Sequence, residues 1–261
     1  MGGAILGGLL KPSVTVTGGV RVTNRTVKKA EALADPGVTS LSTETDPTAN
    51  CTAVTGARIV LIAVKPAMVV DVLRDIADAL EPDAIIISVA AGVTAATMEA
   101  LVLHTVIRAM PNTPAIVGRA ITGLSAGSRA SASDLALATR LFETVGLVLP
   151  IPESQIDSLS AISGSGPAYV FYLIEELTRT AIGLGFSHQQ STVMVNNTFL
   201  GAAELLAASG KAPNELRRQV TSPNGTTERA IAELEKADLS SLFDRATASA
   251  IARAREIAAG G

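Results

Sequence analysis

Short runs of β-branched and other apolar residues alternate with helical periodicity from Val20 to Ile151, and the alternation stops there. Continuous apolar strands separated by helices are typical of a parallel sheet covered on both faces. The rest of the chain shows helical periodicity alone, and Pro150 and Pro152 mark the change. The sequence therefore predicts an α/β dinucleotide-binding (Rossmann-type) domain over residues 1–152, and an all-α domain over residues 153–261.

The individual elements follow from the same patterns. We expect strands at residues 20–23, 59–64, 85–89, 106–107, 121–124 and 147–151. Helices are expected between them at residues 27–33, 68–80 and 133–145. In the second half we expect helices at residues 169–184, 189–208, 213–220, 227–235 and 239–258.

Composition narrows the class of protein. A hydrophobic content of 48% over 261 residues provides ample material for buried cores. The net charge of −3, the scattered basic residues and the scarcity of aromatic residues argue against a nucleic-acid partner. The longest apolar runs are too short to span a bilayer, so no membrane partner is expected.

Cysteine and histidine are equally informative. Cys51 is the only cysteine, so no intrachain disulfide can form, and a reducing compartment such as the cytoplasm is expected. The only histidines are His104 and His188, so we expect no metal site.

A glycine-rich segment opens the sequence. The glycines within residues 1–8, followed by Leu9 and Leu10, resemble the last part of the dinucleotide-binding Gly-x-Gly-x-x-Gly turn and its closely packed helix. Taken alone, they also fit a flexible start. Neither the preceding strand nor the first two glycines of the motif is present, so its neighbours are expected to lose their central partner and expose an apolar slot. We expect weak dinucleotide binding by the chain as written, and recovery when an upstream strand with Gly-x-Gly is restored.

Four further segments follow predicted strands. Arg25 stands where NAD-binding folds place an acid, and an arginine there accommodates the 2'-phosphate of NADP, although it also fits an exposed strand end. The segments 63–66, 90–92 and 108–114 carry proline, glycine and small residues that let the backbone approach a nicotinamide. Each alone would also fit a simple turn, but together they favour a cofactor cleft.

The segment Ser222–Thr227 combines hydroxyl groups with a tight turn. Pro223 ends the preceding helix, Gly225 permits a tight backbone path, and a new helix starts just beyond. Backbone N–H groups at a helix start form a site for a carboxylate or phosphate. An ordinary N-capped loop is the alternative on composition alone.

The segments 24–26, 63–66, 110–115, 163–169 and 222–227 together resemble pyrroline-5-carboxylate reductase, in that family's order and along essentially the whole chain. The resemblance implies reduction of 1-pyrroline-5-carboxylate to L-proline, the last step of proline biosynthesis, with NADPH or alternatively NADH. It also implies a homodimer through the helical half, two chains completing each active site, and assembly of dimers into a decamer.

The resemblance also implies individual roles. Thr227 would offer its hydroxyl to the ring nitrogen as the catalytic residue, and Ser222, Gly225 and Thr226 would bind the substrate with it. The cofactor-binding set would be Met1, Gly2, Asn24, Arg25, Thr26, Asn50, Ala63, Val64, Lys65, Pro66, Ala91, Gly92, Met110, Pro111 and Asn112.

Two positions depart from the family pattern. Asn224 replaces a glycine, which is a modest change because asparagine also tolerates left-handed backbone. Arg58 replaces an acid at the start of a strand, which puts local packing in question.

Two other functions remain open. A β-hydroxyacid dehydrogenase has the same two-domain plan, but it needs a catalytic lysine on a core helix, and no lysine occurs between Leu149 and Gly210. The other alternative is a catalytically impaired or non-catalytic oligomeric homologue.

Overall fold

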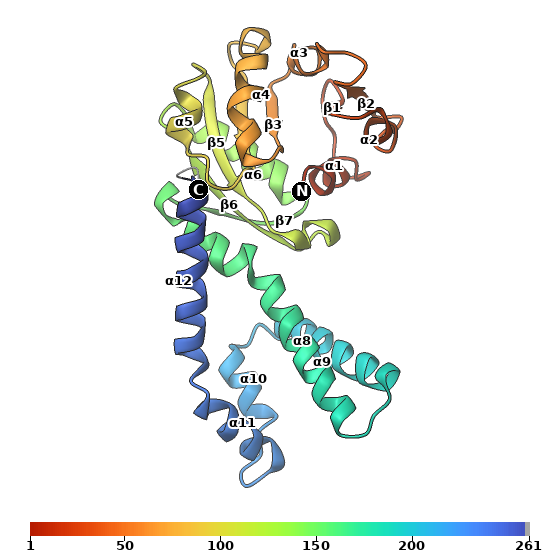
Figure 1. Cartoon of the computed structure of the whole chain (residues 1–261), viewed down its shortest axis with the longest axis vertical. Helices are drawn as coiled ribbons and strands as arrows, with labels where there is room; N and C mark the ends of the chain where they lie inside the picture. Colours follow the sequence, from red (N-terminus) through yellow and green to blue (C-terminus); the bar gives the residue numbers. More distant parts are fainter. Residues whose placement is uncertain (259–261) are drawn as a thin grey trace. The chain divides into compact units, whose positions relative to one another are not determined.

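The computed structural model describes residues 1–258. The described residues form two compact units, Met1–Ser165 with residues 250–258, and Gly166–Ser249 (Figure 1). Each unit is described by itself.

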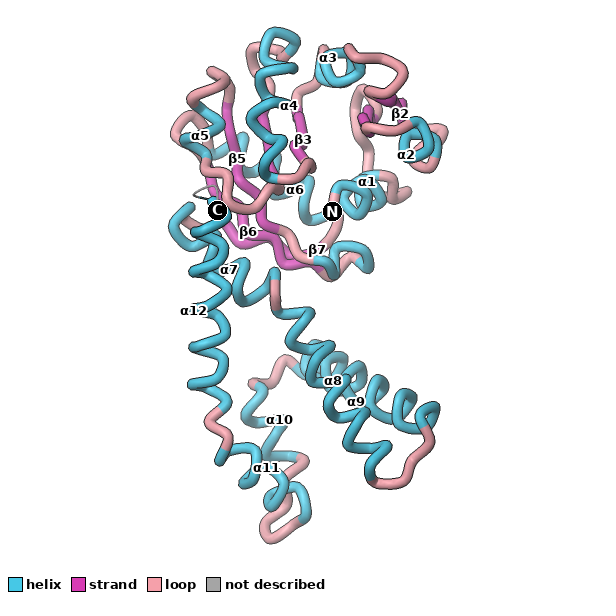
Figure 2. The backbone as a smooth tube through the Cα atoms, viewed as in Figure 1, coloured by secondary structure: helices cyan, strands magenta, loops and turns pink. Residues whose placement is uncertain are grey.

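The first unit contains a five-stranded sheet and a separate strand pair (Figure 2). The sheet has the order β3-β4-β5-β6-β7, and β1 pairs only with β2. The strands are β1 (Val20–Asn24), β2 (Val38–Ser42), β3 (Ile59–Ile62), β4 (Ile85–Ser88), β5 (Thr105–Met110), β6 (Ala120–Ala126) and β7 (Gly146–Pro150). Six of them confirm predicted strands. The sequence prediction missed β2, because its serine and threonine residues give no continuous apolar run.

Strand direction differs from the prediction at one place. The pairs β1–β2, β3–β4, β4–β5 and β6–β7 are parallel, whereas β6 runs antiparallel to β5. Only a 3-10 turn, η3 (Thr113–Val117), joins β5 to β6. Such a short link permits reversal, because a parallel partner would need a longer crossover. The expectation of a parallel sheet was therefore wrong for this one pair.

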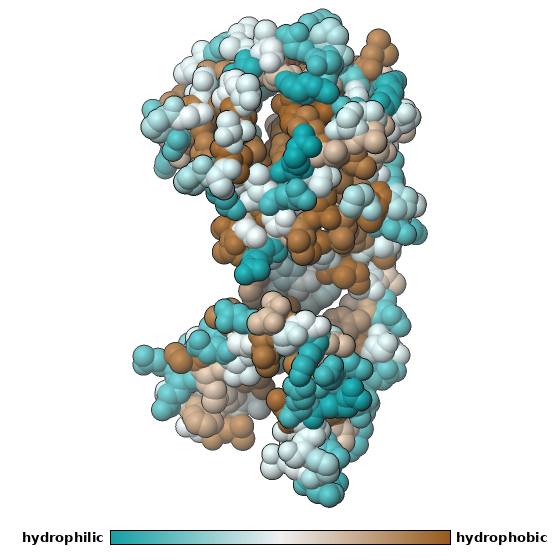
Figure 3. Space-filling view, turned by 180° about the vertical axis from the view of Figure 1, so that it is seen from behind, coloured by the Kyte–Doolittle hydropathy of each residue, from teal (hydrophilic) through white to brown (hydrophobic). Residues whose placement is uncertain are grey.

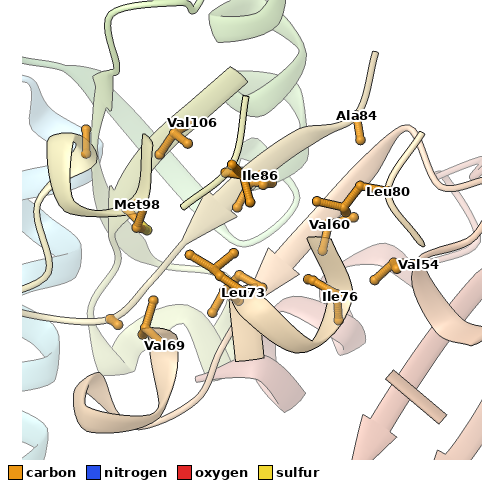
Figure 4. Close-up of a cluster of buried hydrophobic side chains, with 14 residues drawn as sticks. Val54, Val60, Val69, Leu73, Ile76, Leu80, Ala84, Ile86, Met98 and Val106 are labelled. Carbon is orange, nitrogen blue, oxygen red and sulfur yellow. The ribbon is translucent and has the colours of Figure 1, made fainter. Parts of the chain in front are cut away.

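Helices cover both faces of the five-stranded sheet. Alternate side chains of β4 enter different cores, Ile86 on one face and Ile85 and Ile87 on the other. The first core includes Leu73 of α4 and Met98 of α5 (Figure 4). The helices of this unit are α1 (Gly2–Leu9), α2 (Val27–Glu31), α3 (Ala49–Val54), α4 (Val69–Ile76), α5 (Ala95–Glu99), α6 (Ala132–Glu143) and α7 (Ile156–Leu159).

The glycine-rich opening segment forms α1, as expected. Ile5 of α1 is fully buried in the second core beside Phe142 of α6. A Cβ atom on Gly8 would lie 2.4 Å from Cγ1 of Val145, so only glycine permits this close approach. The helix therefore packs as closely as the dinucleotide motif requires.

The second unit is helical, which confirms the prediction for this part of the chain. Its elements are α8 (Gly166–Gly183), α9 (His188–Ser209), α10 (Pro213–Gln219), α11 (Thr226–Lys236) and the start of α12 (Leu239–Ala258). A capping box at Ser187 starts α9, and the rings of Tyr169 and Phe243 lie 6.1 Å apart between α8 and α12. Within residues 1–258, no helix is both long enough and apolar enough to cross a membrane.

The division between the compact units falls after Ser165 and not after Pro152. This division does not test the predicted domain boundary, which stays a prediction. Residues 153–165 belong with the first unit. Two long-range contacts hold this segment there: Glu153 accepts from Arg108 at 2.9 Å, and the Ser163 carbonyl accepts from Asn112 at 2.9 Å.

Candidate active site

The predicted cofactor segments lie at the ends of strands. Residues 63–66, 91–92 and 110–112 come at or just after the carboxyl ends of β3, β4 and β5, which meet at one edge because these strands are parallel. Residues 24–26 end β1 in the separate strand pair. Ligands of open α/β sheets bind at this edge.

The end of β1 offers cationic and amide groups to a ligand. Arg25 is exposed, and Thr26 precedes α2 as its N-cap. The Nδ2 atom of Asn24 is buried and has no hydrogen-bond partner within residues 1–258. A buried unpaired donor is costly, so it indicates a missing acceptor. These groups fit the phosphorylated ribose of NADPH, although Glu44 already accepts the Val27 N–H at 2.9 Å.

The start of α1 lies against the end of β3. A Cβ atom on Gly2 would be 3.2 Å from the Cβ of Ala63, so these two predicted residues are brought together. The Met1 carbonyl accepts from the N–H groups of Ala4 and Ile5, which closes the first turn of the helix. The positive end of a helix dipole at this sheet edge fits the phosphates of a dinucleotide.

Asn112 has a clear anchoring function that the sequence did not reveal. Its Oδ1 atom accepts the Ile121 N–H at 2.9 Å, and its Nδ2 atom donates to the Ser163 carbonyl at 2.9 Å. The residue is buried. Both ends of the amide therefore hold the loop after β5 in place, and its role in cofactor binding stays a prediction.

Arg108 and Glu153 form a second anchor that sequence reasoning missed. The Oε1 atom of Glu153 accepts from Nη1 of Arg108 at 2.9 Å and from the Ala95 N–H at 2.7 Å. Arg108 is only 5% exposed, and its Nη2 atom has no partner within residues 1–258. The one available signal was an arginine within an apolar strand. This anchor fixes the start of α5 to β5.

Asn50 lies in α3, and its side chain is engaged by a neighbouring helix. Its Nδ2 atom donates to Oδ2 of Asp75 on α4 at 2.9 Å. The predicted contact with the adenosine ribose stays untested.

Arg58, which stands where the family pattern has an acid, forms ion pairs with two carboxylates. It pairs with Asp83 at 3.3 Å and with Asp134 at 3.0 Å. The hydroxyl and N–H of Ser131 hydrogen-bond the Asp134 carboxylate and hold its pKa below the usual value, and Arg58 adds a smaller effect in the same direction. The arginine therefore joins the starts of β3 and α6.

In the second unit, the Ser222–Thr227 segment forms the turn predicted before α11. Gly225 is its N-cap, and a Cβ atom there would lie 2.9 Å from the Ser222 carbonyl oxygen, so a larger residue would clash. Asn224 has a φ of 57°, the left-handed conformation that asparagine tolerates.

The groups available in this turn are mainly hydroxyls. Ser222 and Thr226 are exposed and Thr227 is half-buried. Within residues 1–258, no hydrogen bond engages the Thr227 hydroxyl. Glu228 accepts the Asn224 N–H at 2.9 Å, so this backbone donor is not available to a ligand. The hydroxyls and first amides of α11 suit a small anion.

Comparison with known proteins gives consistent matches. Residues 153–257 match the family model for pyrroline-5-carboxylate reductase dimerisation, and residues 1–92 match that for NADP oxidoreductase, coenzyme F420-dependent. A pyrroline-5-carboxylate reductase from Pseudomonas aeruginosa is 40% identical over 80% of this chain and 78% of its own length.

Two solved structures are also similar. The pyrroline-5-carboxylate reductase from Coxiella burnetii has a TM-score of 0.89 and 34% identity, covering 98% of this chain and 94% of its own. The Plasmodium falciparum pyrroline carboxylate reductase with NADP bound has a TM-score of 0.82 and 25% identity, covering 99% of this chain and 94% of its own.

Proposed function

The chain belongs to the pyrroline-5-carboxylate reductase family, and on this basis we propose that it reduces 1-pyrroline-5-carboxylate to L-proline with NADPH. The observation that supports this best is the Ser222–Thr227 turn, which presents hydroxyls and helix-start amides to a small anion. Reduction of this imine would be the last step of proline biosynthesis.

The chemistry needs little acid or base catalysis from the protein. A bound NADPH would supply the hydride for the imine carbon, and the ring nitrogen would keep the proton of the protonated imine as the amine forms. Ser222 and the first amides of α11 bind the carboxylate, and the Thr227 hydroxyl hydrogen-bonds the nitrogen. Together they orient one face of the ring, which is the main task of the protein in such a reaction.

Residues at the end of β1 select between NADPH and NADH. The exposed Arg25 guanidinium would pair with the 2'-phosphate of NADPH, and the Asn24 amide, which has no partner within residues 1–258, would donate to the same region. NADH lacks this phosphate and therefore binds more weakly. Residues at the ends of β3, β4 and β5 line the nicotinamide side.

The helical unit forms a homodimer. Its support is the match to a dimerisation family together with the exposed apolar side chains of α8 and α9. Assembly into a decamer rests on the family resemblance alone. We also place the protein in the cytoplasm, in keeping with its single cysteine.

A turnover assay tests the reaction directly. The purified chain is mixed with pyrroline-5-carboxylate and saturating NADPH, and both NADPH oxidation and proline formation are measured. We expect equal amounts of the two products. A β-hydroxyacid oxidised with NADP⁺ is the comparison substrate, and turnover of that compound instead would overturn the proposal.

A further inference from the structure

A buried arginine stands near the ligand-binding edge of the main sheet. Arg108 lies in β5, two residues before Met110, and is 5% exposed. Charged side chains normally lie at the surface, where Figure 3 shows many hydrophilic residues on the face that it draws. Val106 belongs to the first core and Ile107 to the second, so the alternation of β5 places Arg108 on the side of the first core. A charge in this place needs a specific partner.

The partner is Glu153, whose Oε1 atom joins two loops. It accepts from Nη1 of Arg108 at 2.9 Å and from the Ala95 N–H at 2.7 Å. Ala95 is the first residue of α5 and closely follows the loop after β4, residues 90–92. Arg108 closely precedes the loop after β5, residues 110–112. One carboxylate oxygen therefore ties together two loops that are predicted to line the nicotinamide side.

Residues 153–163 form a brace along the second loop. The first residue of the brace, Glu153, bonds Arg108, and the carbonyl of its last residue, Ser163, accepts from Nδ2 of Asn112 at 2.9 Å. Arg108 and Asn112 are four residues apart, and Met110 lies between them. The brace therefore holds this loop on both sides.

The brace is itself fixed to the sheet. Ile156, in its helix α7, is 1% exposed. A Cβ atom on Gly123 of β6 would lie 2.8 Å from Cδ1 of Leu159, so a larger residue there would push α7 away from the sheet. The brace ends in a π-helical turn, η5 (Ser160–Gly164), and such turns are frequent at functional sites. The two loops are therefore tied to a well-anchored segment.

Stability alone is a weak explanation for the pair of Arg108 and Glu153. The Nη2 atom of Arg108 is buried and has no partner within residues 1–258. A buried ion pair with an unsatisfied donor often contributes little to the free energy of unfolding, because desolvation of the charges offsets their attraction. The pair does supply a short and directional bond, which fixes the distance between the groups that it joins.

We propose that Glu153 is a positioning residue for hydride transfer, which holds residues 90–92 and 110–112 at a fixed separation through Ala95 and Arg108. The inference rests on the proposed reduction with NADPH, because these loops would orient the nicotinamide. A displacement of about 1 Å at a reacting group is enough to slow a reaction about a hundredfold. The 2'-phosphate end of the cofactor would be held at β1 instead, so cofactor affinity should depend little on Glu153.

Hydrogen exchange of the full-length chain without cofactor tests the tie itself. In Glu153→Ala the Ala95 N–H loses its acceptor, so we expect exchange about tenfold faster at Ala95 and in both loops. Glu153→Gln keeps an acceptor oxygen and should restore most of the protection. Asp134→Asn is the matched control, because it weakens an ion pair with Arg58 just before β3, at the opposite end of the parallel strands. It should leave exchange in both loops unchanged.

A single-turnover experiment tests the effect on the chemistry, with the chain in excess over NADPH and with pyrroline-5-carboxylate saturating. The rate constant of NADPH oxidation should fall about a hundredfold in Glu153→Ala and about tenfold in Glu153→Gln, while the Kd for NADPH barely changes. An unfolded fraction lowers the amplitude and not the rate constant, so a merely structural loss is distinguishable. Asp134→Asn should keep the unsubstituted rate constant.

Several results would overturn the inference. They are unchanged exchange in both loops or an unchanged rate constant in Glu153→Ala, an equal fall of the rate constant in Asp134→Asn, and a rise in the Kd for NADPH as large as the fall in rate. Absence of turnover by the unsubstituted chain would instead contradict the proposed function. The exchange experiment needs no cofactor, so it would still decide whether Glu153 holds the two loops.

Discussion

The two compact units differ greatly in how far their apolar side chains are buried. In the first unit, Leu73, Ile86 and Phe142 are 1% exposed or less, and two core clusters cover both faces of the sheet. In the described part of the second unit, the buried hydrophobic residues are Ala181 and Val195, while Phe171 is 66% exposed. Exposed apolar area costs about 25 cal/mol per Å² relative to burial. The first unit therefore buries two hydrophobic cores within one chain, whereas the apolar side chains of the second unit need a further protein surface to cover them.

Disrupting that surface should have the largest effect. Phe171→Glu places a charge on the exposed apolar face of α8, and we expect dimer affinity to fall by about a hundredfold or more, with activity falling in parallel. Sedimentation velocity over a range of protein concentrations measures the dissociation. Arg179→Gln is the control on the same helix, since Arg179 pairs with Glu175 at 3.5 Å and Glu176 at 2.8 Å, both on α8 itself. An unchanged dimer in Phe171→Glu would show that α8 is not the interface.

The substrate turn should give the next largest effect. Thr227→Val keeps the side-chain shape but removes the hydroxyl, so kcat should fall about a hundredfold while the fold persists. Thr192→Val is the matched control, because its hydroxyl bonds the His188 carbonyl of its own helix. Full activity in Thr227→Val would assign the ring nitrogen to another donor. Circular dichroism confirms that both variants remain folded.

A substitution at the cofactor-binding end of β1 should have a smaller effect, which is on cofactor affinity. Arg25→Ala should raise the Kd for NADPH by about ten- to a hundredfold, because a charge-assisted contact to the phosphate is lost. The Kd for NADH should barely change. Lys28→Ala, an exposed neighbour in α2, is the control. Calorimetric titration of both cofactors decides the matter, and equal weakening for NADPH and NADH would contradict the assignment.

What the sequence could predict depended on how local the signal was. The apolar runs of β3 and β4 and the periodicity of α8 and α9 lie within single segments, so these elements were predicted well. The Ser222–Thr227 turn is also local, and the left-handed backbone of Asn224 agrees with the expectation drawn from the family resemblance, in which a glycine stands at this position. The polar strand β2 left no such pattern.

The long-range polar contacts could not be predicted from the sequence. The amide of Asn112 bonds Ser163, 51 residues away, and Arg108 meets Glu153 across 45 residues. Any exposed acid or carbonyl would have been an equally good partner on paper, because charge and hydrogen-bonding capacity do not specify distance along the chain. The same limit applies to Arg58, whose unusual charge was visible but whose partners Asp83 and Asp134 were not.

The smallest expected effect tests whether the first unit is stable by itself. Asp134 caps α6 together with Ser131, and the hydrogen bonds from Ser131 lower its pKa in the folded protein. Asp134→Asn should therefore lower the free energy of unfolding by about 1 kcal/mol at neutral pH. A lowered folded pKa contributes stability above the unfolded pKa, which is about 3.9 for aspartate, and that contribution is lost as the pH falls through the folded value. The difference between the two proteins should accordingly shrink under acid conditions.

Urea unfolding at several pH values and protein concentrations measures this change in the free energy of unfolding. The unfolding is monitored with a spectroscopic probe that reports on the first unit. Because the Asp134 contacts lie within one chain, the loss should not depend on protein concentration, in contrast to that of Phe171→Glu. Ser133→Ala is the control, since the Ser133 hydroxyl hydrogen-bonds the Ser131 hydroxyl in the same turn and makes no hydrogen bond to Arg58 within residues 1–258. A concentration-dependent loss in Asp134→Asn would mean that the first unit also relies on association, and that the contrast between the two units is one of degree.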